Sequence, residues 1–285
     1  MKRYILTAGL LLALAAPLRA QGVEETARAT EAALGGRVGV MLRAPAAAPL
    51  AEWRADERFP VSSTFKVPLC GAVLARVDKG EDRLERVIAY GSDDLVTYSP
   101  VTEAHAGTGM TLGDLCGATI ALSDNTAGNL LLTTLGGPEG FTAFLRESGD
   151  AVTRLDRWET ALNEGTPGDV RDTTTPAAMA ATLERLLFGD VLSSQARGML
   201  EGWMERNQVG DALIRTSLPE DWTIGDKTGA GGHGSRSIIA VIRGPRGDAW
   251  LAAIYLTGND ADMETRNAAI ARIGAAMVEE IEKRR

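Results

Sequence analysis

The strand-like segments of this chain lie near its two ends, and this placement constrains the fold more than any other sequence feature. Val38–Leu42 and Ala51–Arg54 predict strands near the start, and Ser237–Ile242 and Trp250–Leu256 predict strands near the end. The turn-forming residues Gly244–Asp248 separate the last two runs, which indicates a hairpin. Strands at both ends with helical sequence between them predict that the ends fold together into one sheet.

The middle of the chain, about residues 63–215, has a helical pattern. Val23–Leu34 and Asp260–Glu282 predict further helices at the ends. We therefore expect an α+β fold in which an antiparallel sheet flanked by terminal helices forms a discontinuous α/β lobe from residues 21–62 and 216–285. An all-helical lobe from residues 63–215 would lie beside it. The junction of two lobes is a common place for a pocket, so we expect the functional site there.

Residues 1–20 have the pattern of a secretory signal peptide. Lys2 and Arg3 precede the apolar run Ile5–Ala16, and small residues lead to a plausible cleavage position after Ala20. The run is short for a membrane span, although an uncleaved anchor is the alternative. We therefore expect an exported protein, periplasmic or secreted, with no membrane association after cleavage.

Composition excludes several functions. The formal net charge of −8 argues against a nucleic-acid partner, which requires a basic face. Two histidines and two cysteines leave little for a metal cluster, and we expect no metal and no other cofactor. No G-x-S-x-G motif is present, which argues against a Ser-His-Asp hydrolase. Gly229–Gly234 fits G-x-G-x-x-G but precedes a strand-like run, which contradicts a dinucleotide site.

Lysine is rare in this chain, so each lysine is informative. The sequence has 25 arginines and 5 lysines, which suggests that a retained lysine supplies a compact charge or an amine able to lose its proton. Ser63 and Lys66 lie three residues apart, on one face of a helix that begins there. Such an amine can accept the serine proton and activate the serine as a nucleophile. The alternative is a helix N-cap followed by a surface lysine.

Two further short motifs carry polar groups suited to a site. Ser123–Asn125 stands between two helical runs, where a turn with an N-cap is the alternative. Lys227 and Thr228 could hold a carboxylate at a strand edge, and Gly229 would let a substrate approach the backbone. The alternative for this motif is a strand-edge lysine beside a glycine bulge. Each motif is weak alone, but the three together in this order are a strong signal.

In order and spacing the three motifs resemble the S-x-x-K, S-D-N and K-T-G set of class A β-lactamases and penicillin-binding proteins. The likeness to class A serine β-lactamases covers nearly the whole mature chain. A fourth segment, Arg157–Asn163, resembles the Glu-x-x-Leu-Asn signature of their omega loop, with Thr160 where the family often has proline. This fourth signature distinguishes the β-lactamases from their transpeptidase relatives.

The resemblance implies a role for each matching residue. Ser63 would be the nucleophile, Lys66 or Glu159 the base for acylation, and Ser123 the proton relay to the leaving nitrogen. The backbone N–H groups of Ser63 and Ala230 would form the oxyanion hole. Tyr98 would lie at the site mouth, with core packing as its alternative, and Asn163 would hold a water together with Glu159. Arg236 would bind the substrate and would be oriented by Asn267. The other substrate-binding residues would be Asn125, Lys227, Thr228 and Gly229. The structural pairs would be Arg157 with Asp172 and Cys70 with Cys116.

The resemblance also implies an activity. We expect hydrolysis of the β-lactam amide of penicillins, and of early cephalosporins, through a serine acyl-enzyme, giving antibiotic resistance. Cys70 and Cys116 match the disulfide of the ordinary penicillinase type, with two buried free thiols as the alternative. The partner would be a small-molecule β-lactam bound by a monomer. The alternatives are a penicillin-binding D-Ala-D-Ala peptidase and a non-catalytic β-lactam sensor, neither of which needs Glu159.

Overall fold

The computed structural model describes residues 22–285, so the predicted signal peptide lies outside the described residues. The helices are α1 (Val23–Leu34), α2 (Lys66–Asp78), α3 (Leu112–Ala121), α4 (Asn125–Thr134), α5 (Gly137–Glu147), α6 (Pro176–Leu187), α7 (Ser194–Glu205) and α8 (Met263–Glu282). The main strands are β1 (Arg37–Arg43), β2 (Pro49–Trp53), β7 (Thr223–Ala230), β8 (Arg236–Arg243) and β9 (Ala249–Thr257). Four two-residue strands are β3 (Phe59–Pro60), β4 (Val87–Ile88), β5 (Met110–Thr111) and β6 (Thr173–Thr174).

The five main strands form one antiparallel sheet in the order β2-β1-β9-β8-β7. Strand β1, from the start of the chain, pairs along its length with β9, so that Val38 lies opposite Leu256. The predicted joining of the two chain ends into an α+β fold is therefore confirmed. The β8–β9 hairpin is also present, and each strand extends one residue beyond both of its predicted ends.

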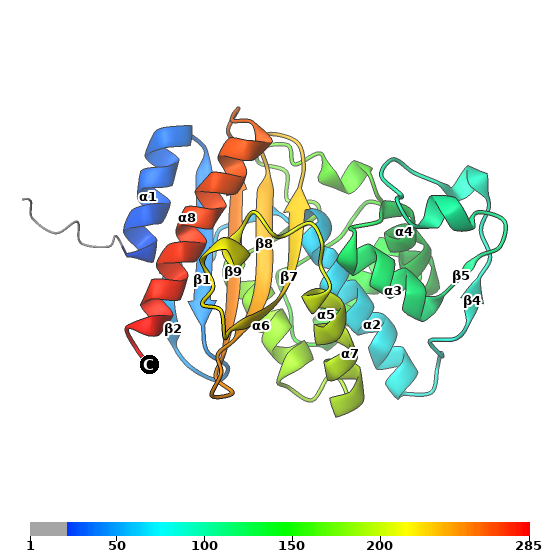
Figure 1. Cartoon of the computed structure of the whole chain (residues 1–285). Coiled ribbons are helices and arrows are strands. Elements are labelled where there is room, and N and C mark those ends of the chain that lie inside the picture. Colours follow the sequence, from blue (N-terminus) through cyan, green and yellow to red (C-terminus); the bar gives the residue numbers. More distant parts are fainter. Residues whose placement is uncertain (1–21) are drawn as a thin grey trace, which may run out of the picture.

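Both faces of the sheet are covered, which explains why its strands are almost continuously apolar. On β9, Leu251, Ala253 and Tyr255 belong to the core shared with the middle helices. The alternating residues Ala252 and Ile254 belong to a second core with α1 and α8. Figure 1 shows α1 and α8 on one side of the sheet and the helices from the middle of the chain on the other.

The middle of the chain differs in one detail from the expected all-helical lobe. It contains the short strands β4, β5 and β6, of which β4 pairs with β5 and β6 pairs with β3. Two residues are too few to produce a strand period in the sequence, so pattern analysis could not find them. None of the helices within residues 22–285 combines the length and apolar composition that a membrane span requires.

Strand β7 is the edge of the sheet that meets the start of α2. A Cβ added at Gly229 would lie 3.2 Å from the backbone nitrogen of Ser63 and 2.5 Å from Oγ of Ser237. A larger side chain here would require Ser237 and the turn at Ser63 to shift, so glycine favours this close approach of strand to helix. The close contact brings Lys227–Gly229 beside Ser63, although the two motifs are more than 160 residues apart in sequence.

Candidate active site

Ser63 lies in a 3₁₀ turn, Ser62–Phe65, that runs directly into α2. Thr64 fixes this turn, because its hydroxyl donates to the carbonyl of Val61 at 2.5 Å and bonds the Tyr255 hydroxyl at 3.0 Å. Ser63 is 8 % exposed, and it reaches the wall of a cavity. The turn therefore presents one hydroxyl to a cavity from an otherwise buried backbone.

Lys66 is fully buried and makes three polar contacts. Its Nζ donates to Oδ1 of Asn125 at 2.6 Å and to the carbonyl of Ser123 at 2.9 Å. The same nitrogen lies 3.0 Å from Oε1 of Glu159, and neither side chain is exposed. Burial lowers the pKa of Lys66, and the nearby Glu159 carboxylate opposes this shift. The predicted base candidates Lys66 and Glu159 thus form one buried ion pair.

Glu159 is held by two asparagines. Nδ2 of Asn163 donates to its Oε2 at 2.5 Å. Asn129 of α4 bonds the backbone of Glu159 on both sides, donating to its carbonyl at 3.0 Å and accepting from its N–H at 2.9 Å. The Asn129 contacts were not predicted, since an asparagine inside a helical run gives no motif.

The segment that carries Glu159 is closed by a salt bridge at its neck. Nε of Arg157 lies 2.5 Å from Oδ2 of Asp172, which is 1 % exposed. Asp172 also accepts from the backbone N–H groups of Asp156 and Arg157. The structure therefore brings together the predicted pair of Arg157 and Asp172, as well as Glu159 and Asn163.

Lys227 on β7 is also fully buried. Its Nζ donates to Oγ of Ser123 and to the carbonyl of Thr228, both at 2.9 Å. Burial lowers its pKa well below the ordinary value, and the charge of Lys66 adds to that shift. Ser123 thus connects the two lysines, since its carbonyl accepts from Lys66 and its hydroxyl from Lys227.

A carboxylate behind Lys227 was missed by sequence reasoning. Asp226 is buried and lies 2.6 Å from Nε of Arg215, and the amide of Asn207 also donates to it. Burial nevertheless raises the pKa of Asp226, because desolvation of the carboxylate outweighs these contacts. Asp226 is next to the K-T-G motif, but its partners come from loops about ten and twenty residues away, which no short motif connects.

Asp124 organises the loop around the site mouth. Its side chain caps α4 by accepting from the N–H of Ala127. Oδ2 also accepts from the N–H groups of Val101 and Thr102, both at 2.9 Å. Two residues tied to this loop, Tyr98 and Ser123, have φ of +66° and +61°. Left-handed conformations at non-glycine residues are costly and tend to persist where a site needs a fixed geometry.

Arg236 lies opposite Ala230 in the β7–β8 pair. Its Nε donates to Oδ1 of Asn267 at 2.8 Å, and its Nη1 donates to the carbonyl of Gly229 at 3.2 Å. Burial, followed by the charge of Arg266, lowers the pKa of Arg236 to about 10, so it keeps its charge at neutral pH. The predicted contact between Asn267 and Arg236 is present.

These residues surround one cavity of about 390 Å³. Tyr98 is 53 % exposed at its rim, which excludes the alternative of core packing for that ring. The lining residues are Ser63, Tyr98, Ser123, Asn125, Asn163, Val209, Thr228, Gly229, Ala230, Arg236 and Met263. Val209 and Met263 were not predicted, because an apolar residue in a loop or at a helix start carries no chemical signature. The cavity offers a nucleophile and the guanidinium of Arg236 for a carboxylate, and the buried Lys227, Lys66 and Glu159 lie behind its lining.

Cys70 and Cys116 lie in contact, and both are buried with free thiols. Sγ of Cys70 lies 3.8 Å from the carbonyl oxygen of Cys116. Burial raises the pKa of the Cys70 thiol well above its ordinary value. The disulfide between them stays a prediction. Within residues 22–285, no three His, Cys, Asp or Glu side chains are grouped closely enough to hold a metal ion.

Comparison with known proteins gives consistent matches over the described residues. The sequence model of the β-lactamase enzyme family matches residues 22–281. An ancestral (GNCA) β-lactamase of class A is 55% identical, with 90% of this chain and 99% of that chain covered and a TM-score of 0.88. The last common ancestor of Gram-negative bacteria (GNCA4) β-lactamase class A is 53% identical, with 91% and 99% covered and a TM-score of 0.89. A double mutant of that ancestor, bound to the transition-state analogue 5(6)-nitrobenzotriazole, is 52% identical, with 92% and 100% covered and a TM-score of 0.89.

Proposed function

The chain belongs to the β-lactamase enzyme family as a class A serine β-lactamase that hydrolyses β-lactams, and on that premise we propose how its residues divide the reaction. Ser63 attacks the lactam carbonyl and forms an acyl-enzyme, while the carbonyl oxygen rests between the N–H groups of Ser63 and Ala230. The observation that carries this proposal is the buried contact between Lys66 and Glu159, 3.0 Å apart behind the cavity that Ser63 faces.

The ion pair and Ser123 form the proposed proton route for acylation. The proton of the Ser63 hydroxyl passes to the pair formed by Lys66 and Glu159, as the new C–O bond forms. Ser123 then delivers a proton to the lactam nitrogen as the C–N bond breaks. Lys227 donates to the Ser123 hydroxyl at 2.9 Å, and Lys66 donates to the Ser123 carbonyl at 2.9 Å, so the two lysines hold Ser123 in place for this role. A neutral amine is accessible to Lys66 because burial lowers its pKa.

Deacylation depends on Glu159 and Asn163. Glu159 would take a proton from a water that attacks the acyl carbonyl, and Ser63 would leave as its hydroxyl is restored. Oδ1 of Asn163 is buried and accepts no hydrogen bond from the described residues, so it is free to bind that water. This step separates the proposal from a D-Ala-D-Ala peptidase or a β-lactam sensor, in which the acyl-enzyme need not react with water.

We assign substrate recognition to the polar wall formed by β7 and β8. The β-lactam carboxylate would bind Lys227, Thr228 and Arg236, with the guanidinium able to donate two hydrogen bonds. Asn125 would bind the acylamide side chain, and Tyr98 would border it at the mouth. Of these residues, all but Lys227 line the cavity, Arg236 keeps its charge, and Lys227 bonds the lining residue Ser123 at 2.9 Å.

A penicillin-selective spectrum is the finer part of the proposal. Cβ atoms added at Gly231 and Gly232 would lie 2.6 Å and 2.2 Å from backbone oxygens of Asn163 and Glu164, so these glycines let the Glu159 segment pack closely on β7. We expect a narrow cavity of this kind, with Arg236 beside it, to favour penicillins and early cephalosporins. We also propose that the protein is exported, as a periplasmic or secreted monomer, and that Cys70 and Cys116 form a disulfide.

A turnover experiment tests the residue roles. Excess chromogenic cephalosporin is mixed with the purified parent protein and with three variants. These are Ser63→Ala, Glu159→Gln and Glu147→Gln, the last being a control at an exposed site. We expect many turnovers by the parent and the control, none by Ser63→Ala, and a burst of one equivalent by Glu159→Gln. Mass spectrometry should then find the acyl group on Ser63. Rapid sustained turnover by Glu159→Gln would contradict the deacylation role.

Comparing substrates tests the spectrum. We expect kcat/KM for benzylpenicillin to exceed that for cefotaxime by more than a hundredfold, or about 3 kcal/mol in transition-state binding. Arg236→Gln should lower kcat/KM for benzylpenicillin chiefly through KM. Equal efficiency toward both drugs would refute the penicillin-selective assignment without affecting the assignment of Ser63.

A further inference from the structure

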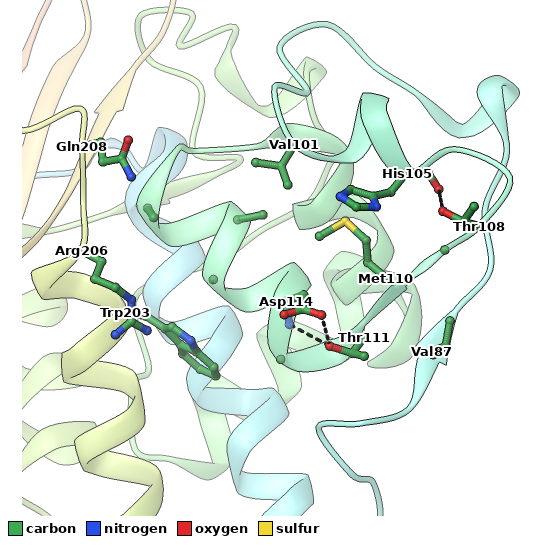
Figure 2. A pocket seen from close by; sticks show the side chains of 15 residues that line it. Val87, Val101, His105, Thr108, Met110, Thr111, Asp114, Trp203, Arg206 and Gln208 are labelled. Carbon is green, nitrogen blue, oxygen red and sulfur yellow. Dashed lines mark hydrogen bonds between the residues drawn. The ribbon is translucent and has the colours of Figure 1, made fainter.

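A second cavity, which we call the α3–α7 cavity, shares no lining residue with the catalytic one. It measures about 830 Å³ and lies between α3, the end of α7 and the segment around His105. Figure 2 shows Trp203, Arg206 and Gln208 on one side of it, and Val101, His105 and Met110 across from them. The face of α3 that lines the cavity carries Gly113, Gly117, Ala118 and Ala121, whose small side chains leave room for a ligand body.

Trp203 supplies an unpaired donor in this cavity. The residue is 7 % exposed, and its Nε1 would lie 3.8 Å from a Cβ added at Gly117 on the cavity floor. No described residue accepts a hydrogen bond from this Nε1. The ring is buried, but its Nε1 is not among the fully buried unpartnered atoms, so the N–H opens into the cavity, where a ligand acceptor can reach it.

Arg206 lies one helical turn beyond Trp203 and adds a positive charge on the same side. Among the described residues it has no ion-pair partner, and its guanidinium is exposed. The amide of Gln208 follows two residues later. Donors with one positive charge and no carboxylate among them are complementary to an anion that can accept several hydrogen bonds.

The remaining wall is mixed, with polar side chains at His105, Thr108 and Thr111, and its apolar part favours an apolar ligand body and fixes its direction. Val101 and Met110 line the far side, and the glycines and alanines of α3 present no polar side chain. Asp114 is the carboxylate of the lining, and it lies toward the start of α3, where its Oδ2 accepts from the Thr111 hydroxyl at 2.6 Å. Its charge repels an anion from that end, so the anionic group belongs near Arg206.

We propose that the α3–α7 cavity is a second binding site, specific for a small aromatic carboxylate. The carboxylate accepts from Nε1 of Trp203 and from the guanidinium of Arg206. The aromatic body lies on the face of α3 at Gly117 and reaches toward Met110. The site is separate from catalysis, because the residues that bind the ligand do not border the cavity that contains Ser63.

The probe for this site is 2-naphthoate, with 2-naphthamide as its neutral counterpart. Binding to the full mature protein is measured directly by ligand-observed NMR and by titration calorimetry. A ligand of this size at ordinary efficiency binds with a Kd of about 1 mM. We expect the amide to bind about tenfold more weakly, since it lacks the charge that Arg206 recognises.

Two matched pairs of variants locate the binding. Gly117→Leu fills the cavity floor and should abolish binding, whereas Gly198→Leu places the same side chain on α7 where nothing lies within 4 Å. Arg206→Gln should weaken binding about tenfold, whereas the exposed Arg272→Gln on α8 should leave it unchanged. If Gly117→Leu does not fold, as judged by circular dichroism, Gly117→Ala replaces it with an expected severalfold loss.

The outcome does not depend on the proposed roles of Ser63 or Glu159, because it needs no turnover. Equal binding by Gly117→Leu and Gly198→Leu, or no saturable binding to the parent at millimolar probe, would overturn the proposal. Competitive inhibition of β-lactam hydrolysis, unchanged in Arg206→Gln, would place the probe in the catalytic cavity and would also overturn it.

Discussion

At the residue scale, Glu159, the proposed deacylation base, is positioned by a neutral neighbour. Asn129 bonds both backbone groups of Glu159, at 2.9 and 3.0 Å, while Asn163 bonds its side chain. A neutral amide can fix the position of Glu159 without removing its negative charge. Lys66 is the only described side chain that forms an ion pair with it.

Asn129→Ala tests whether this support matters for deacylation. The substitution removes both hydrogen bonds, and we expect a loss of about 1–3 kcal/mol in the free energy of unfolding because two backbone groups lose their partner. We also expect kcat to fall about tenfold, with acyl-enzyme accumulating because deacylation slows more than acylation. Urea unfolding and rapid-quench mass spectrometry measure the two effects.

The control for Asn129→Ala is Thr133→Ala, one turn further along α4, where the hydroxyl only bonds the carbonyl of Asn129. If Asn129→Ala lost stability while its kcat and acyl-enzyme level matched those of the control, Asn129 would have a structural role only.

At the element scale, the features that could be predicted from the sequence are those that depend on the local residue pattern. The main strands were predictable because both faces of the sheet are buried, which leaves long apolar runs such as Trp250–Leu256. Ser63 and Lys66 were predictable because their spacing follows from one helical turn. The contacts of Asp226 with Arg215 and of Glu159 with Asn129 were not predictable, since they depend on how separate elements pack.

The packing of β1 against its neighbours gives a sharp stability test. A Cβ added at Gly39 would lie 2.4 Å from the ring of Phe59 and 2.8 Å from Cγ of Pro176. Gly39→Ala should therefore lower the free energy of unfolding by about 1–3 kcal/mol through overpacking. Gly198→Ala, on open helix surface, should instead raise it by up to about 1 kcal/mol. Chemical denaturation measures both, and a neutral Gly39→Ala would show that Phe59 moves freely.

The link between α2 and α3 is the second test at this scale. Cys70 and Cys116 are buried and in contact, so we expect exported protein to contain the disulfide. Closing a loop of this length should stabilise the protein by about 4 kcal/mol in the chain-entropy model. Thiol titration in urea without reductant should find no free thiol, and adding reductant should lower the unfolding midpoint. Two reactive thiols in the unfolded, unreduced protein would refute the pairing.

At the scale of the whole molecule, the two buried lysines of the proposed catalytic site lower the stability of the fold. Lys66 and Lys227 are both fully buried, and burial lowers the pKa of each. A buried cation loses its hydration, and the hydrogen bonds and the ion pair with Glu159 offset only part of that cost. The fold therefore carries two lysines that the unfolded chain protonates more readily, which makes stability depend on pH.

The sign of that dependence follows from proton linkage. Above the lowered pKa of folded Lys227, the unfolded chain still binds a proton until the ordinary lysine pKa of about 10.4. In this window the contribution of Lys227 to the free energy of unfolding rises with pH, by at most about 1.4 kcal/mol per pH unit. Lys227→Met removes this pH-dependent contribution. The free energy of unfolding of the variant, relative to that of the parent, should therefore be greatest near neutral pH and should decline toward pH 10. The free energies of unfolding are measured by urea denaturation across this pH range for the parent, Lys227→Met and the exposed control Lys79→Met. A difference between parent and Lys227→Met that stays constant with pH would mean that Lys227 keeps an ordinary pKa in the folded protein.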